Sequence, residues 1–198
     1  SDLVLKNEFI VVGAHYDHVG DGRLGHSNGP IGYIHNGADD NASGCAALLE
    51  TIEALSDSHV DTRRSILFAF WDGEEMGMVG SNHWFDAPTI PPTAVRLSIN
   101  IDMVGRLRDG RLEVSGTRTG YGLRRFLSRA GNDSIWLDFS RELTANSDHW
   151  PFLEHRIPIV LLHTGEHPDY HRPSDDADKI NHAGLESVTR YLLDTVVA

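Results

Sequence analysis

Histidine and carboxylate side chains follow short apolar segments of the chain, at the point where each segment ends. In chain order they are His15, Asp17, Glu74, Glu75 and Asp102. Imidazole nitrogens and carboxylate oxygens without thiolates suit zinc, with cobalt or manganese as alternatives. Several carboxylates at one place repel one another, so such a cluster implies a bound cation. These residue types therefore predict a metal site.

A pair of carboxylates that performs acid–base chemistry on sugars is an alternative interpretation. It would leave the neighbouring histidines without a role. Most of the other histidines are not expected to bind metal: His18, His26 and His35 belong to a Gly-rich loop region, where a solvated or hydrogen-bonding role is expected. His163 and His167 lie close to the last candidate ligand and could be mistaken for it.

The apolar segments predict strands. Segments 9–14, 66–71 and 157–162 are nearly continuous apolar runs, as in strands covered on both faces of a parallel sheet. Segment 97–101 alternates apolar and polar residues, and 111–115 and 134–139 are further candidates. Helices are predicted where apolar residues recur at helical spacing, over 45–55, 123–127 and 185–196, with a short helix over 150–154.

The alternation of strands and helices predicts an α/β fold with a mixed, mostly parallel sheet. The carboxyl ends of parallel strands form the ligand crevice of such a sheet. We therefore expect the candidate ligands to meet on one rim. Segment 20–37 is predicted to be a long loop within a single domain, rather than a linker between domains.

Two local features of the backbone are predicted near the site. Gly37 and Gly44 permit a tight backbone around Asp40, and Asn41 or Ser43 can cap the helix that follows. The fragment Ser147-Asp148-His149 looks catalytic, but an N-cap of the short helix over 150–154 explains its first two residues.

Composition excludes several classes of protein. The 198 residues carry a formal charge of −12, which argues against nucleic acid as a partner. No apolar run approaches the roughly 20 residues that a membrane-spanning helix needs. The one cysteine, Cys45, excludes an internal disulfide, and it is expected to be a buried, inert thiol. The chain begins at Ser1 without a signal segment, so we expect a mature chain or an excised fragment.

Five segments together resemble one known family. They are 13-GAHYDH-18, 37-GADDNASG-44, 72-DGEEMG-77, 100-NIDMVG-105 and 170-YHRPSD-175. In this order they resemble the M28 family of zinc metallopeptidases, which includes bacterial aminopeptidases. The resemblance implies a mixed, mainly parallel sheet sandwiched between helices, of the zinc-exopeptidase or phosphorylase/hydrolase-like type.

The resemblance also implies roles for individual residues. The implied ligands of two zinc ions are His15, Asp40, Glu75, Asp102 and His171. Asp40 would bridge the two ions, with His15 and Asp102 on one and Glu75 and His171 on the other. A second set of residues would assist without binding metal. Asp17 would orient His15, Glu74 would be the general base and acid that acts on a water shared by the ions, and Tyr170 would stabilise the oxyanion.

The function implied by the resemblance is a two-zinc exopeptidase, here an aminopeptidase acting on peptides. A carboxypeptidase, a glutaminyl-cyclase-like enzyme and a non-catalytic binding domain remain alternatives. Family catalytic domains carry further residues before the first strand. The expectation is therefore one catalytic domain over 1–198, truncated at its N-terminal side, with an exposed sheet edge or face. The resemblance implies a secreted or periplasmic location, and the oligomeric state stays open.

Overall fold

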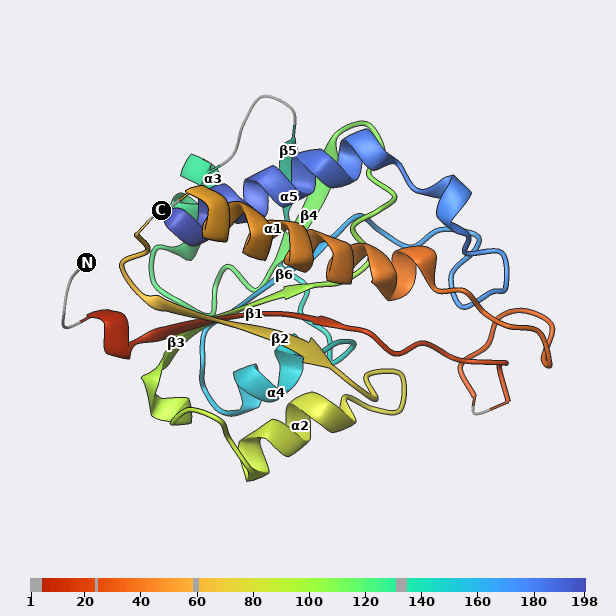
Figure 1. The fold of residues 1–198 in the computed structure, drawn as a ribbon, viewed down its shortest axis with the longest axis horizontal. Coiled ribbons are helices and arrows are strands. Elements are labelled where there is room, and N and C mark those ends of the chain that lie inside the picture. The colour runs from red at the N-terminus through yellow and green to blue at the C-terminus, as the bar shows by residue number, and fades with distance from the viewer. Residues whose placement is uncertain (1–4, 24, 59–60, 131–134) are drawn as a thin grey trace.

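A mixed β-sheet forms the centre of the computed structural model, which describes residues 5–23, 25–58, 61–130 and 135–198 (Figure 1). Within these residues six strands lie in the order β2-β1-β3-β6-β4-β5. Their bounds are β1 Phe9–His15, β2 Ser65–Trp71, β3 Val95–Ile101, β4 Arg111–Ser115, β5 Trp136–Phe139 and β6 Ile159–His163. Strands β2, β1, β3 and β6 run parallel to one another. Strand β4 is antiparallel to β6 and parallel to β5. The predicted mixed, mainly parallel sheet is confirmed.

Helices cover both faces of the sheet. On one face lie α1 (Gly44–Ser58), α3 (Leu123–Ala130) and α5 (His182–Val197) (Figure 1). On the other lie α2 (Val79–Asp86) and α4 (His149–Glu154). Short helical turns occupy Leu5–Asn7, Ala38–Ser43, Pro92–Ala94 and Ala177–Lys179. Helix α2 was not predicted, because Trp84 and Ser81 are its buried residues and they do not form an apolar stripe.

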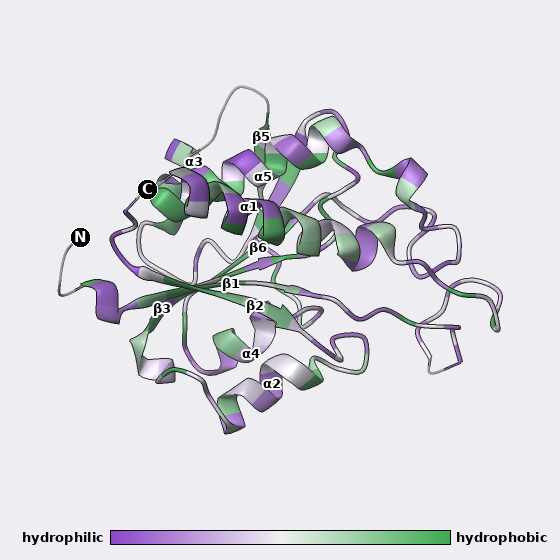
Figure 2. Cartoon of the chain, in the orientation of Figure 1, coloured by the Kyte–Doolittle hydropathy of each residue, from purple (hydrophilic) through white to green (hydrophobic). Residues whose placement is uncertain are grey.

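Two apolar cores result, one on each face of the sheet. Val12, Ile99 and Leu162 point into the larger core against α1 and α5, where Tyr191 is fully buried. Trp71, Trp84 and Phe152 form the smaller core under α2 and α4. The central strands are accordingly mostly hydrophobic, whereas hydrophilic and hydrophobic residues alternate along the helices (Figure 2).

The sequence-based boundaries agree with the structure except in detail. Strand β3 carries its polar residues Ser98 and Asn100 buried, so its alternation does not mark a solvated face. The predicted strand 134–139 begins at Trp136, and its first residue lies outside the described part of the chain. The described residues of 20–37 form neither helix nor strand, as predicted. None of the described helices is long and apolar enough to cross a membrane.

Substitutions of two adjacent leucines of α1 test how the larger core is packed. Leu48 is fully buried and Leu49 is 59% exposed. We expect Leu48→Ala to lower the free energy of unfolding by about 2–5 kcal/mol, because it leaves a cavity in the core. Leu49→Ala makes the same chemical change on the same helix and is expected to stay within about 0.5 kcal/mol of the wild type. Urea unfolding of both variants measures the difference. Equal losses would contradict the packing described.

Candidate metal centre

The candidate ligands meet at the carboxyl ends of the parallel strands, as predicted. His15 is the last residue of β1, and Asp102 follows β3 directly. Glu75 lies in the turn after β2, Asp40 in the turn before α1, and His171 in the loop after β6. The side chains of all five are at most about one-tenth exposed, so their charges are largely removed from water.

Asp40 faces a different histidine with each of its carboxylate oxygens. Its Oδ1 lies 3.3 Å from Nε2 of His15, which is also 3.3 Å from Oδ1 of Asp102. Its Oδ2 lies 3.0 Å from Nε2 of His171, which is 3.2 Å from Oε2 of Glu75. One carboxylate thus joins two groups of potential ligands.

The outer ring nitrogens of both histidines are held by the backbone. Nδ1 of His15 lies 3.1 Å from the carbonyl oxygen of Asp17, and Nδ1 of His171 lies 2.5 Å from that of His26. Because a carbonyl only accepts, Nδ1 carries a hydrogen in both rings, and Nε2 is the nitrogen that faces the carboxylates. A ligating histidine is oriented in this way at metal sites.

The carboxylate of Asp17 has a different main contact from the one predicted. Its Oδ1 is 3.7 Å from Nδ1 of His15, farther than the backbone oxygen of the same residue. Its two oxygens accept hydrogen bonds from the backbone nitrogens of Glu74 at 3.0 Å and Glu75 at 3.2 Å. Asp17 therefore links the end of β1 to the turn that carries both glutamates.

His18 lies in the same cluster, so of the two roles expected for it, solvation or hydrogen bonding, the structure favours a polar contact. Its Nδ1 is 2.8 Å from Oε1 of Glu75 and 3.8 Å from Oδ2 of Asp40, and its side chain is 10% exposed. The sequence feature that could have pointed to His18 is its position three residues after His15. The bend after β1 brings the two rings to the same carboxylate, and this bend is not readable from sequence.

The donor set fits divalent metal. Two groups of three ligand atoms, each within 4.8 Å of one another, share Asp40: His15, Asp40 and Asp102, and His18, Asp40 and Glu75. Both nitrogens of His18 and Oε1 of Glu75 are buried without a well-directed hydrogen bond. Nitrogen and oxygen donors that converge without satisfying one another are suited to zinc.

Without a cation, histidines balance the charge of the carboxylates. Burial alone would lower the pKa of His171, but Asp40 and Glu75 outweigh it and raise that pKa to about 10. Burial likewise opposes ionisation of Glu75, yet His171 and His18 bring its pKa down to about 2. Burial would also lower the pKa of His15, and the nearby carboxylates, first Asp102, raise it well above its usual range.

Glu74 has the opposite environment from its neighbour Glu75. Burial, followed by the charges of Asp102 and Asp148, raises its pKa to about 9. A divalent cation among these carboxylates would oppose that shift. Glu74 lines a cavity of about 490 Å³ together with Tyr170 and His171. Glu75 lines the same cavity and also faces His18 and His171.

Tyr170 packs against a candidate ligand. Its ring stacks on that of His171 with a centroid separation of 3.8 Å. Burial, and next the charge of Asp40, raises the pKa of its hydroxyl, so this group keeps its proton and can donate a hydrogen bond into the cavity.

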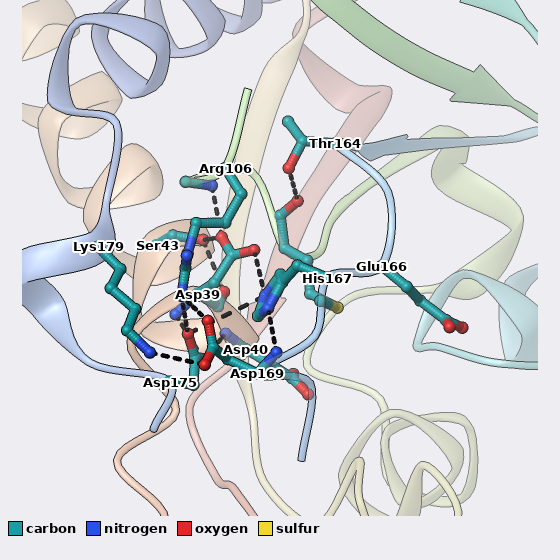
Figure 3. A network of polar contacts seen from close by, with 12 residues as sticks. Asp39, Asp40, Ser43, Arg106, Thr164, Glu166, His167, Asp169, Asp175 and Lys179 are labelled. Carbon is teal, nitrogen blue, oxygen red and sulfur yellow. Dashed lines mark hydrogen bonds and ion pairs between the residues drawn. The ribbon is translucent and has the colours of Figure 1, made fainter. Parts of the chain in front are cut away.

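A second network of charged residues supports the turn that contains Asp40 (Figure 3). Oδ2 of the fully buried Asp175 accepts from the backbone nitrogens of Asp39 at 2.8 Å and Asp40 at 3.1 Å. Its Oδ1 accepts from Arg106 at 3.0 Å. The carboxylate of Asp39 instead lies 3.1 Å from Nε2 of His167. Asp39 and His167 thus belong to this support and not to the ligand groups.

Glycine and asparagine shape the same turn. Gly37 has the left-handed φ of 62°, and a Cβ on Gly44 would lie 2.8 Å from the carbonyl oxygen of Ile101. Oδ1 of Asn41 accepts from the nitrogen of Gly44 at 3.0 Å, which confirms the predicted cap. Ser43 does not cap the helix, because its hydroxyl donates to Asp39.

The predicted cap of α4 is wrong for both residues named. Ser147 donates to Oδ2 of Asp102 at 2.6 Å, and Asp148 accepts from Ser81 instead of capping the helix. Ser147 therefore orients a candidate ligand, a contact that only the tertiary structure creates. Cys45 is half-buried rather than buried, and its thiol donates to the backbone oxygen of His15.

Asp175 offers a test of this support. We expect Asp175→Asn to lower the affinity for Zn²⁺ by about 10–100-fold, because a neutral amide cannot accept both the two backbone hydrogen bonds of the Asp40 turn and the hydrogen bond of Arg106. Asp178→Asn removes the same charge at an exposed position three residues away. Titration of the folded, chelator-treated proteins with Zn²⁺ gives the affinities. Equal affinities of the two variants would contradict the role of Asp175.

Comparisons with known proteins agree with the fold and identify the family. The model of Peptidase family M28 matches residues 3–196. Leupeptin-inactivating enzyme 1 of Streptomyces exfoliatus is 27% identical over 174 residues, covering 87% of this chain and 36% of that protein. The Probable lipoprotein aminopeptidase LpqL of Mycobacterium tuberculosis is 32% identical over 112 residues, covering 56% and 19%.

A solved structure extends the likeness to three dimensions. BSAP, a zinc aminopeptidase from Bacillus subtilis, superposes with a TM-score of 0.75 at 25% identity, over 96% of this chain and 45% of that one. The chain thus spans less than half the length of each of these three proteins. Because the family match extends over nearly the whole sequence, we conclude that this chain belongs to peptidase family M28.

Proposed function

We propose that the protein is a two-zinc exopeptidase that removes N-terminal residues from peptides. The observation that carries the proposal is the carboxylate of Asp40, which presents Oδ1 to His15 and Oδ2 to His171. A single ion would need only one of these oxygens. The name of the relative BSAP, a zinc aminopeptidase, supports the choice of metal and reaction.

Five residues are the proposed zinc ligands. His15 and Asp102 would hold one ion, Glu75 and His171 the other, and Asp40 both. Each ion would then have three protein ligands, which leaves a position for water or substrate, as in catalytic zinc sites. Ions bound in this way lower the pKa of water toward neutrality and polarise the scissile carbonyl.

Glu74 is the proposed general base. Its carboxylate lines the cavity beside the ligands but belongs to neither group of ligand atoms. It would take a proton from the attacking water and then donate that proton to the leaving amine. Positive charge at the ligands favours the ionised form of Glu74 that the first step needs.

Two further residues assist in this proposal. The protonated hydroxyl of Tyr170 would donate a hydrogen bond to the oxyanion of the tetrahedral intermediate. Asp17 would fix the position of Glu74 through the backbone hydrogen bond at 3.0 Å, besides holding the chain beside His15.

We propose that residues 1–198 form one catalytic domain that acts on peptide substrates. A secreted or envelope location is part of the proposal, and the name of the lipoprotein relative LpqL supports it.

The reaction type is tested with matched substrates. A dipeptide with a free α-amine and its N-acetylated form differ only at the end that an aminopeptidase recognises. We expect the zinc-loaded protein to hydrolyse the free dipeptide at least about tenfold faster, because acetylation removes the charged amine. Chromatography of the products measures both rates. Equal or faster cleavage of the acetylated peptide would indicate a carboxypeptidase instead.

Glu74→Gln tests the proposed base. We expect the variant to bind about two zinc ions per chain, like the wild type, and to lose about 10²–10⁴-fold in kcat, because the amide cannot accept a proton. Elemental analysis and peptide hydrolysis give the two quantities. Glu53→Gln, at an exposed position of α1, controls for the loss of one charge. Retained turnover in Glu74→Gln would exclude the proposed role.

A further inference from the structure

A second cavity lies beside the metal centre, on the α4 side of the sheet. Its volume is about 280 Å³. Glu113 of β4 and His163 at the end of β6, which are partners in the antiparallel register, form one wall. Glu142 and Glu166 come from the loops that follow β5 and β6.

Among the described residues, one ion pair reaches the glutamates of this cavity, from Arg111 to Glu113. Its lining includes three glutamates and, within the described chain, no Lys or Arg. Arg111 is 3.8 Å from Glu113 but lies closer, at 2.6 Å, to Asp138. Arg108 donates to the backbone oxygen of Glu166, not to its carboxylate. Figure 3 shows the carboxylate of Glu166 pointing away from the network around Asp39.

A fully buried histidine adds a free acceptor to the cavity lining. Nε2 of His149 lies 3.0 Å from the carbonyl oxygen of Thr144, so the hydrogen of the neutral ring is on Nε2. Burial lowers the pKa of His149, which keeps the ring neutral. The lone pair on Nδ1 has no partner among the described residues. A buried acceptor without a donor is uncommon in native proteins, and an N–H group of a ligand would satisfy this one.

The cavity adjoins the site of the proposed reaction. Asn146 lines both this cavity and the one that contains Glu74 and Tyr170. The next residue, Ser147, donates to Asp102. The charge of Glu166 contributes to the raised pKa of Tyr170, so the two groups are electrostatically close. The two cavities are therefore neighbours along the segment that contains Asn146.

The arrangement suits an organic cation better than another metal ion. Within the described residues the two groups of converging metal-ligand atoms both contain Asp40, and neither includes a residue of this cavity. The glutamates are instead spread around the cavity. A guanidinium presents five N–H donors in a plane and can contact separated acceptors at once.

We propose that this cavity binds the side chain of the substrate's N-terminal residue and selects arginine or lysine. The inference rests on the proposed aminopeptidase function and names its substrate class. Glu142, Glu166 and Glu113 attract the cation, and Nδ1 of His149 accepts one of its hydrogen bonds.

Arginine and citrulline aminoacyl p-nitroanilides test the proposal, because their side chains have nearly the same shape and differ in charge. We expect the zinc-loaded protein to show a kcat/KM at least about tenfold higher for arginine than for citrulline, since unpaired carboxylates favour a cation. The double variant Glu142→Gln and Glu166→Gln should reduce that ratio by about tenfold. Glu53→Gln should leave the ratio unchanged.

The outcomes separate this inference from the function on which it rests. Hydrolysis of both substrates with a ratio near one would overturn the selectivity and leave the aminopeptidase function standing. An unchanged ratio in the folded double variant would overturn the assignment to these glutamates. Hydrolysis of neither substrate, nor of a leucine p-nitroanilide, by the zinc-loaded protein would overturn both.

Discussion

Repulsion between buried carboxylates is the constraint on which the rest of this structure depends. Asp40 faces His15 together with Asp102, and it faces His171 together with Glu75, in a place that excludes most water. In the metal-free protein the histidines compensate by binding protons, which is why the pKa of His171 rises to about 10. Divalent cations would neutralise the carboxylates in the same way. The histidines would then lose their extra protons, and their ring nitrogens would bind the cations through lone pairs.

Such a cluster persists only where the backbone cannot relax. The parallel strands fix His15 and Asp102, because both residues stand at strand ends within one rigid sheet. Asp40 lies on a turn and needs other support. Asp175 provides it by accepting hydrogen bonds from the backbone of that turn, while Arg106 neutralises Asp175. The hydrogen bonds of Asp175 and Arg106 thus hold Asp40 in position, although Asp40 lies in a turn and not in a strand.

Acidic residues occur in two arrangements in this molecule, and geometry distinguishes them. Those at the metal centre point their oxygens at one another and at shared histidines. Those of the neighbouring cavity surround an open volume without sharing a partner. Convergent oxygens suit a small ion, whereas separated oxygens suit a larger cation with several donors. The net charge of −12 therefore includes at least two local arrangements with different chemistry.

The sequence by itself predicted the strands and most helices, because long apolar runs and helical spacing are local signals. It predicted the cap by Asn41 for the same reason. It also indicated metal-binding residue types at strand ends, His15, Glu75 and Asp102, whereas Asp40 and His171 were expected as ligands only from the family resemblance. Only the tertiary structure decided which partners the remaining polar residues have. His18 joins Glu75 through a bend, Ser147 reaches Asp102 across 45 residues, and Glu113 lies opposite His163 through an antiparallel pairing. Contacts between distant segments depend on how the strands are ordered, and no local pattern encodes that order.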